Sequence, residues 1–336
     1  MSELSDVSSE EQVADLVQEA KAQQAEVVAA TPEPRPPRRL NIIGRRNLFF
    51  AISLVVIIPG IVSMWHNHFL LGIDFAGGTE LTVSFANHPS LAQVQRVVDA
   101  ENANGSVIET GSGYIIRYPV LNTQQLANIQ SDLKNHLGPT NVQQILSVGG
   151  TIAGETIFLS LLAVLTASAA ILLLLAIRFR NVPGGWRAGF QFGGSALAAL
   201  LHDVFVLTGL YSIFGTVLKW PVGEINAYFV TAVLTVVGFS VHDTIVVFDR
   251  IRENLRVSQR LSFEQVVNLS IMQTAARSII TSFTVVLVLA AIFISGGPSL
   301  QGLALALLIG IVSGTYSSIF NAAPLLVVWR RLQPLR

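Results

Sequence analysis

Six apolar runs constrain the fold of this chain more than any other feature of its sequence. They cover residues 48–64, 152–177, 188–214, 225–248, 278–295 and 300–329. Each is close to or above the roughly 20 residues that a helix needs to cross a bilayer. Only 12% of the 336 residues are charged, against roughly 25% in a soluble domain. The predicted fold class is therefore an α-helical membrane protein with six transmembrane helices.

Residues 66–150, between the first two runs, have the periodicity of a small soluble domain. Alternating or β-rich segments predict strands at 81–85, 106–109, 114–118 and 141–148, and helical spacing of apolar residues predicts helices at 90–100 and 124–137. The resulting order, βαββαβ, is that of a ferredoxin-like domain. We therefore expect an α+β domain inserted between helices one and two.

Arginines cluster on one side of the predicted spans. They occupy the segments 35–46, 178–187, 250–260 and 330–336, whereas the opposite connections hold only Arg96, Arg117, Lys134 and Lys219. By the positive-inside rule both termini are expected in the cytoplasm and the inserted domain outside the membrane.

A net charge of zero gives no reason to expect a nucleic-acid partner. The chain has no cysteine, which excludes disulfides and thiol chemistry.

The expected domain boundaries follow from these patterns. They are a cytoplasmic tail with a Pro/Arg-rich linker at 1–46, helix one at 47–65, a periplasmic domain at 66–150, helices two to six at 151–329 with a cytoplasmic hairpin at 249–262, and a cytoplasmic tail at 330–336. Residues 1–30 are acidic and lack the apolar core of a signal peptide. We expect a solvated tail, with a short capped helix after Ser8 as the alternative.

The fourth run carries a carboxylate, Asp243, inside an apolar helix. A charged residue there costs about 2.5–3.5 kcal/mol on insertion scales and marks a functional site when a partner can be named. Arg277 opens the fifth run, and both residues lie 17 positions from Arg260 in the intervening charged connection. Two helical arms of equal length would place the side chains at similar depth. Arg277 is then a candidate counter-charge that pairs with Asp243 and releases it during ion flow; a static structural ion pair is the alternative.

Further polar groups lie inside the spans and are candidates for the same ion relay. His202 and Asp203 are in the third run and His242 precedes Asp243, while Ser240 and Thr281 are candidates for hydrogen bonds along the path. Neighbouring helical residues point about 100° apart, so a His-Asp dipeptide does not chelate from one face, and we expect no metal site. An intramembrane aspartyl protease would need Asp203 and Asp243 to face each other, and a nearby cation argues against a shared proton.

In the sixth run, Gly310, Gly314, Ser317 and Asn321 form a small-residue stripe suited to close helix packing.

A glycine-rich motif follows the first run. Its characteristic residues are Gly72, Asp74, Gly77, Gly78 and Thr79. It lacks the Gly-Lys-Ser/Thr ending of a phosphate loop. The glycines are expected to allow tight backbone packing where the inserted domain meets the membrane.

Together these motifs resemble the SecF family over about residues 40–330. The resemblance is carried by the motif at 72–79, Leu-His-Asp-Val at 201–204, the fourth-run stretch at 237–254, Gln-Thr-Ala-Ala-Arg-Ser-Ile-Ile-Thr-Ser at 273–282, Gly-Gly-Pro at 296–298 and Gly-Thr-Tyr-Ser-Ser-Ile-Phe at 314–320. The family's membrane aspartate falls on Asp243 and its fifth-helix arginine on Arg277. Where the family usually has Asn before the aspartate, this chain has His242.

The resemblance implies a subunit of the bacterial Sec export machinery in the inner membrane. Such a subunit pairs with SecD into a twelve-helix assembly similar to resistance-nodulation-division exporters, and associates with the SecYEG channel, often with YajC. It is expected to promote late translocation of unfolded polypeptide by ion motive force, with H⁺ or Na⁺ as coupling ion. It would have no catalytic residues, organic cofactor or bound metal. The alternatives are half of a small-molecule exporter and an intramembrane aspartyl hydrolase.

Overall fold

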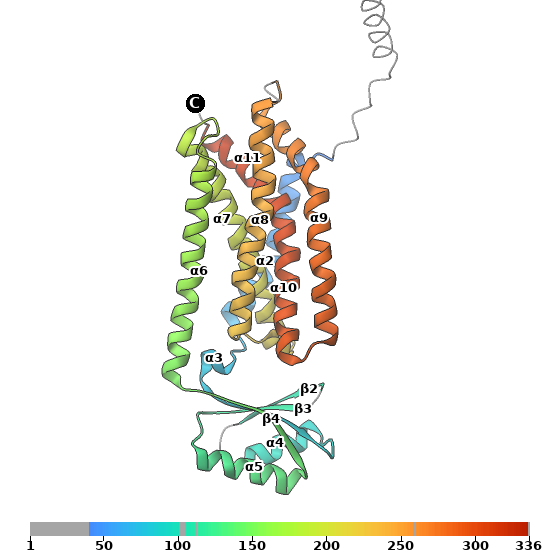
Figure 1. Ribbon diagram of the computed structural model, residues 1–336. Helices are drawn as coiled ribbons and strands as arrows, with labels where there is room; N and C mark the ends of the chain where they lie inside the picture. Colours follow the sequence, from blue (N-terminus) through green and yellow to red (C-terminus); the bar gives the residue numbers. More distant parts are fainter. Residues whose placement is uncertain (1–39, 101–104, 112, 258–259, 335–336) are drawn as a thin grey trace, which may run out of the picture. The chain divides into compact units, whose positions relative to one another are not determined.

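The structure is a computed structural model that describes residues 40–100, 105–111, 113–257 and 260–334. The expectations for the acidic tail and the Pro/Arg-rich linker fall on residues 1–39, outside the described residues. Within the described part, apolar helices and one small sheet form separate layers (Figure 1).

Among the described residues, six helical stretches are long and apolar enough to cross a membrane, which confirms the predicted number. Their helices are α2 (Arg46–His66, after the 3₁₀ turn η1, Ile43–Arg45), α6 (Gly150–Arg178), α7 (Gly185–Ser212), α8 (Ala227–Val257), α9 (Phe263–Ser295), α10 (Pro298–Ser317) and α11 (Ala323–Leu332). The third stretch continues through a π-helical turn, η2 (Ile213–Val217), and a second such turn, η4 (Ser318–Ala322), joins α10 to α11 in the sixth. A short 3₁₀ turn, η3 (Pro221–Gly223), precedes α8.

The charged segment after Phe248 continues α8 rather than forming a loop. It contains neither Gly nor Pro, and two i,i+3 ion pairs support the helix, Arg250–Glu253 at 2.6 Å and Arg252–Asp249 at 3.3 Å. Helix α9 then begins after Ser262, whose side chain accepts a hydrogen bond from the Gln265 backbone N–H in a capping box. The connection between the two helices is therefore shorter than the predicted hairpin at 249–262.

The inserted domain has all six elements that the periodicity predicts. They are β1 (Gly78–Phe85), α4 (Leu91–Ala100), β2 (Ser106–Thr110), β3 (Gly113–Tyr118), α5 (Thr123–Leu137) and β4 (Thr140–Val148). The strands form one antiparallel sheet in the order β2-β3-β1-β4. Figure 1 shows α4 and α5 on the side of the sheet away from the long helices. Leu81, Ile116, Val94 and Leu133 are fully buried between the sheet and these helices.

One helix of a single turn, α3 (Ile73–Ala76), was not predicted. It lies inside the glycine-rich motif that follows α2. Four residues are too few to show helical periodicity, so the sequence pattern does not reveal it.

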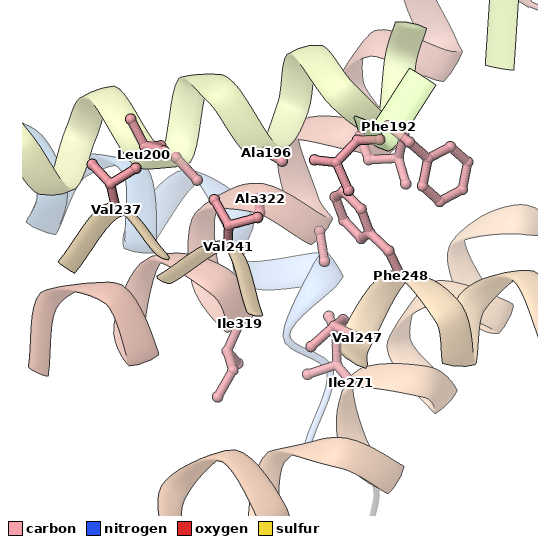
Figure 2. Packing of buried hydrophobic residues seen from close by; sticks show 14 of the residues in the cluster. Phe192, Ala196, Leu200, Val237, Val241, Val247, Phe248, Ile271, Ile319 and Ala322 are labelled. Carbon is pink, nitrogen blue, oxygen red and sulfur yellow. The ribbon is translucent and has the colours of Figure 1, made fainter. Parts of the chain in front are cut away.

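The long helices pack around a core of aliphatic and aromatic side chains. Phe179, Phe192 and Phe248 join α6, α7 and α8, with ring centroids 4.8 Å apart for the stacked Phe179–Phe192 pair and 5.0 Å apart for the perpendicular Phe192–Phe248 pair. Figure 2 shows Leu200 of α7 beside Val237 and Val241 of α8 in the same core. Helices α2 and α7 approach each other closely at Gly60 and Gly209, where an added Cβ on Gly60 would lie 2.8 Å from the Gly209 Cα.

Candidate functional site

Asp243 lies near the middle of α8 and is 4% exposed. The hydroxyls of Ser278 and Ser282 on α9 lie close to its carboxylate. Among the described residues, neither the Asp243 Oδ2 atom nor the Ser278 Oγ atom has a hydrogen-bond partner. A buried carboxylate oxygen without a donor is costly in a protein interior. The site therefore favours uptake of a proton or a cation.

Side-chain bonds between α8 and α9 fix the relative depth of the two helices. Arg250 Nε donates to Gln273 Oε1 at 2.6 Å, and Asn254 Nδ2 donates to Ser270 Oγ at 2.9 Å. Asp243 lies seven residues before Arg250 on α8, and Ile280 lies seven residues after Gln273 on α9, so these two positions are at the same depth. Ser278 and Ser282, rather than Arg277, are therefore level with Asp243.

The expectation that Arg277 lies at the depth of Asp243 is wrong by about one helical turn. The prediction centred the hairpin on Arg260, but the bond between Asn254 and Ser270 centres it two positions later, at Ser262. Arg277 is exposed and lines a cavity beside Val246 and Arg250. Within the described part of the chain, no ion pair joins Arg277 to Asp243.

Asp203 on α7 is the centre of a hydrogen-bond network among three helices. Its side chain is 1% exposed. Ser240 of α8 and Ser317 of α10 each donate to Oδ2 at 2.6 Å, and Ser313 of α10 donates to Oδ1 at 2.7 Å. We call these three hydroxyls the serine cage. They supply hydrogen-bond donors to both oxygens of the buried carboxylate and hold it in place.

The cage was only partly visible in the sequence. Ser240 was predicted as a supporting polar residue, whereas Ser317 was interpreted as part of a packing stripe and Ser313 was not singled out. Ser313 and Ser317 are four residues apart and so share one face of α10. That spacing within an apolar run is the signal that marks them.

The two histidines differ in position. His202 contacts Asp203, with Nδ1 3.0 Å from Oδ1, and its side chain is 11% exposed. When Nδ1 carries the proton and donates it to the carboxylate, Nε2 is left as an acceptor, and this atom is buried without a partner among the described residues. His242 is exposed although its neighbour Asp243 is buried, because consecutive helical residues point about 100° apart. Thr281, the other supporting residue, donates its hydroxyl to the Arg277 carbonyl within α9.

The glycine-rich motif joins the inserted domain to the start of α8. Gly72 N–H donates to the Ile225 carbonyl at 2.9 Å, and Asp74 Oδ2 accepts from the Ala227 N–H at 2.9 Å. Asp74 therefore caps the helix that carries Asp243, where a negative charge is favoured. Gly77 and Gly78 have φ of 71° and 133°, which favours glycine at both positions.

Thr79 and Arg117 make further links in the inserted domain. The Thr79 hydroxyl accepts from the Leu121 N–H at 3.2 Å and lies 3.1 Å from the Ser147 hydroxyl. The Arg117 guanidinium on β3 pairs with Glu80 at 2.8 Å and also with Glu224, in the connection before α8. Burial raises the pKa of Glu224, although Arg117 opposes that shift. Burial acts to lower the pKa of Arg117, but Glu224 and Glu80 outweigh it and the pKa is raised.

Two family models match this chain. The model described as "Protein export membrane protein SecD/SecF, C-terminal" matches residues 128–332, and the model described as "SecD/SecF GG Motif" matches residues 62–87. The second match covers the glycine-rich motif, and the first covers every span after the inserted domain.

Curated relatives match over nearly their whole length. A protein translocase subunit SecF from Thermobaculum terrenum is 40% identical over 311 residues, covering 88% of this chain and 96% of the relative. The corresponding protein of Anaerolinea thermophila is 41% identical over 296 residues, covering 86% and 94%.

A solved structure has a similar fold. It is the crystal structure of SecDF from Thermus thermophilus, described as a translocon-associated membrane protein. The match has a TM-score of 0.78 and 29% identity, and covers 89% of this chain. This chain spans only 40% of that longer one.

Proposed function

The chain belongs to the SecD/SecF family of protein-export membrane proteins, and on that premise we propose how it contributes to export. It is a multi-pass inner-membrane protein that serves the Sec translocase as an accessory subunit. We infer that ion movement through Asp243 drives its work late in translocation. No chemical step on the exported chain is part of this proposal.

The observation that carries the proposal is the buried, unpartnered oxygen of Asp243. In low dielectric, such a carboxylate gains most from binding a proton or a small cation. Ser278 and Ser282 supply hydroxyl oxygens on the facing helix, which suits either H⁺ or Na⁺ as the coupling ion. Arg277 becomes an alternating counter-charge if its side chain moves about one turn toward Asp243.

Weaker members of the relay are also proposed. His202 touches the caged Asp203, and His242 adjoins Asp243 on α8. A proton on either imidazole would add a positive charge beside a carboxylate. The serine cage supports a fixed position for Asp203, whereas the unpartnered oxygen supports a switching role for Asp243.

The inserted domain is proposed to be ferredoxin-like and periplasmic. Its element order and its sheet order β2-β3-β1-β4 support the fold. The arginines at the other ends of the helices support a cytoplasmic location for both termini. Through Asp74, which caps α8, movement of this domain would reach the helix that carries Asp243.

The proposed partners follow from the relatives. SecD is expected to supply the part of a SecDF-type assembly that this chain does not span. SecYEG, YajC, the unfolded exported polypeptide and membrane lipid are the further partners, and no nucleic acid is expected.

The test is Asp243→Asn in cells depleted of the native protein. The export rate of a secreted precursor and the proton or sodium flux of membrane vesicles would be measured together. Both should fall, whereas Asp249→Asn, a change at a charged residue two turns further along α8, should leave ion flux intact. Normal export and normal flux in Asp243→Asn would remove this residue from the mechanism.

Two other functions make different predictions. Half of a small-molecule exporter would not co-purify with SecD. An intramembrane aspartyl hydrolase needs two carboxylates that share a proton, but both oxygens of Asp203 accept serine hydroxyls. If the protein were such a hydrolase, a cleaved substrate should be detectable, and Asp203→Asn and Asp243→Asn should abolish its cleavage to the same extent.

A further inference from the structure

We propose that Glu224 is a positioning residue that couples the inserted domain to α8, and that Gly72 provides the space for its side chain. The inference rests on the proposed function, because α8 carries Asp243. It deepens that function by naming the contact through which the domain and the helix move together. The contact is made by residues 70–74 and 224–227, which we call the junction, together with Arg117 of the sheet.

The Arg117 guanidinium holds one acid on each side of the junction. It pairs with Glu80 at 2.8 Å and also with Glu224 in the connection before α8. The three side chains are only 12–15% exposed, so salt screens these pairs less than pairs on the surface. Arg117 and Glu80 face each other on the paired strands β3 and β1, which fixes the guanidinium to the sheet. Through Glu224 the same guanidinium fixes the connection before α8.

Backbone hydrogen bonds carry this link into the first turn of α8. The Ile225 N–H donates to the Leu70 carbonyl at 2.8 Å, and the Ile225 carbonyl accepts from the Gly72 N–H at 2.9 Å. The Asn226 side chain then accepts from the Phe229 N–H at 3.1 Å, as a residue that caps a helix does. Glu224 therefore begins a short, hydrogen-bonded connection that ends in α8. A displacement of the sheet would displace the first turn of the helix.

Gly72 is required at the junction because Glu224 lies where another residue would have its side chain. A Cβ added to Gly72 would overlap the Glu224 carboxylate and would lie 2.9 Å from the Asn226 Cβ. The φ of Gly72 is −75°, which any residue can adopt. Space, rather than backbone conformation, therefore explains the first glycine of the glycine-rich motif.

The first test measures hydrogen–deuterium exchange of the purified full chain in detergent. Glu224→Ala should speed exchange at the Ile225 and Gly72 N–H groups about tenfold, the effect of losing one hydrogen bond between charged groups. Glu80→Ala is the matched control, because it removes the other partner of Arg117 at similar burial but leaves the link to α8. It should leave these amides unchanged. Equal acceleration in the two variants would overturn the positioning role.

The second test separates coupling from ion binding. Export of a secreted precursor and ion flux of membrane vesicles are measured in cells depleted of the native protein. Glu224→Ala should slow export severalfold while flux stays at the wild-type level, whereas Asp243→Asn should lower both. Glu224→Gln keeps an oxygen that accepts from Arg117 and should recover most of the export.

The outcomes of the second test distinguish the two proposals. If Glu224→Ala lowers flux together with export, the coupling role of Glu224 is overturned and the ion site at Asp243 stands. If Asp243→Asn has normal flux and export, the ion site is overturned, and the exchange test still decides whether Glu224 positions α8.

Gly72→Ala gives an independent check that changes no charge. The added methyl group should push Glu224 away from Arg117 and reproduce the faster exchange at Ile225. Gly149→Ala, in the connection between β4 and α6, is the control, because nothing lies within 4 Å of its added Cβ. These two variants carry the test if Glu224→Ala does not remain folded. Wild-type exchange in Gly72→Ala would show that this glycine does not make room for Glu224.

Discussion

Asp203 and Asp243 lie on adjacent helices, yet only Asp203 has both carboxylate oxygens hydrogen-bonded. Asp203 accepts from the serine cage, whereas Asp243 has a buried oxygen without a partner among the described residues. Exposure does not separate the two, since they are 1% and 4% exposed. The difference lies in the donors around each carboxylate. Asp203 is therefore held in place by its donors, whereas one oxygen of Asp243 lacks a donor among the described residues.

Substituting each aspartate by asparagine should separate structure from function. Asp203→Asn introduces an N–H₂ donor among serine donors and should lower the free energy of unfolding by about 3 kcal/mol. Asp243→Asn removes an uncompensated charge and should change it by less than about 1 kcal/mol. Denaturant unfolding of the purified protein in detergent measures both. Equal destabilisation by the two substitutions would contradict the contrast drawn from the structure.

Each hydroxyl of the serine cage should contribute separately to stability. Ser317→Ala removes a donor to a charged, buried acceptor and should cost about 2 kcal/mol. Ser318→Ala is a matched control because Ser318 is equally buried but donates to a backbone carbonyl, that of Thr315. Its cost should be about 1 kcal/mol or less. Unfolding curves of the two variants that superimpose would show that the cage adds nothing beyond ordinary hydrogen bonding.

The elements that sequence analysis predicted well are those specified by local patterns. Six apolar runs predicted six spans, and period-2 and helical spacing predicted the order of strands and helices in the inserted domain. Each signal is contained within one element and needs no knowledge of its neighbours. Even so, α8 extends to Val257 because the charged residues after Phe248 are compatible with a helix.

The site was harder to predict because it depends on how helices are aligned. The spacing of Asp243 and Arg277 about Arg260 suggested equal depth, but the bonds from Asn254 and Arg250 shift α9 relative to α8. The serine cage requires α10 to lie against α7 and α8 at one register. The spacing of Ser313 and Ser317 indicates a shared polar face on α10, but no pattern within a single helix shows which carboxylate that face meets.

The contact between α2 and α7 predicts a steric effect. A Cβ on Gly209 would lie 2.7 Å from the Gly60 Cα, and backbone atoms cannot move aside as a flexible side chain would. Gly209→Ala should therefore destabilise the protein by about 1–3 kcal/mol. Gly154→Ala on α6 is the control, because nothing lies within 4 Å of its added Cβ. Thermal unfolding should show a lower midpoint for the first variant and an unchanged or higher midpoint for the second.

The Arg117–Glu224 pair predicts a pH dependence outside the membrane spans. Burial raises the pKa of Glu224 above its ordinary value of 4.5 in the folded protein. The folded state therefore binds this proton more tightly than the unfolded state. The contribution of Glu224 to the free energy of unfolding is therefore greatest below pH 4.5. It is lost as the pH rises through the pKa that Glu224 has in the folded protein.

Glu224→Gln should remove that dependence. The variant keeps the shape of the side chain without its charge, and Arg117 retains Glu80 as a partner. Its unfolding temperature relative to wild type should therefore rise between about pH 4 and about pH 7, because only wild type loses stability over this range. Glu109 is an exposed acid in a cleft that Arg117 and Glu224 also line. Glu109→Gln is therefore the control and should give a profile parallel to that of wild type. A constant difference between Glu224→Gln and wild type across the range would show that burial does not govern the ionisation of Glu224.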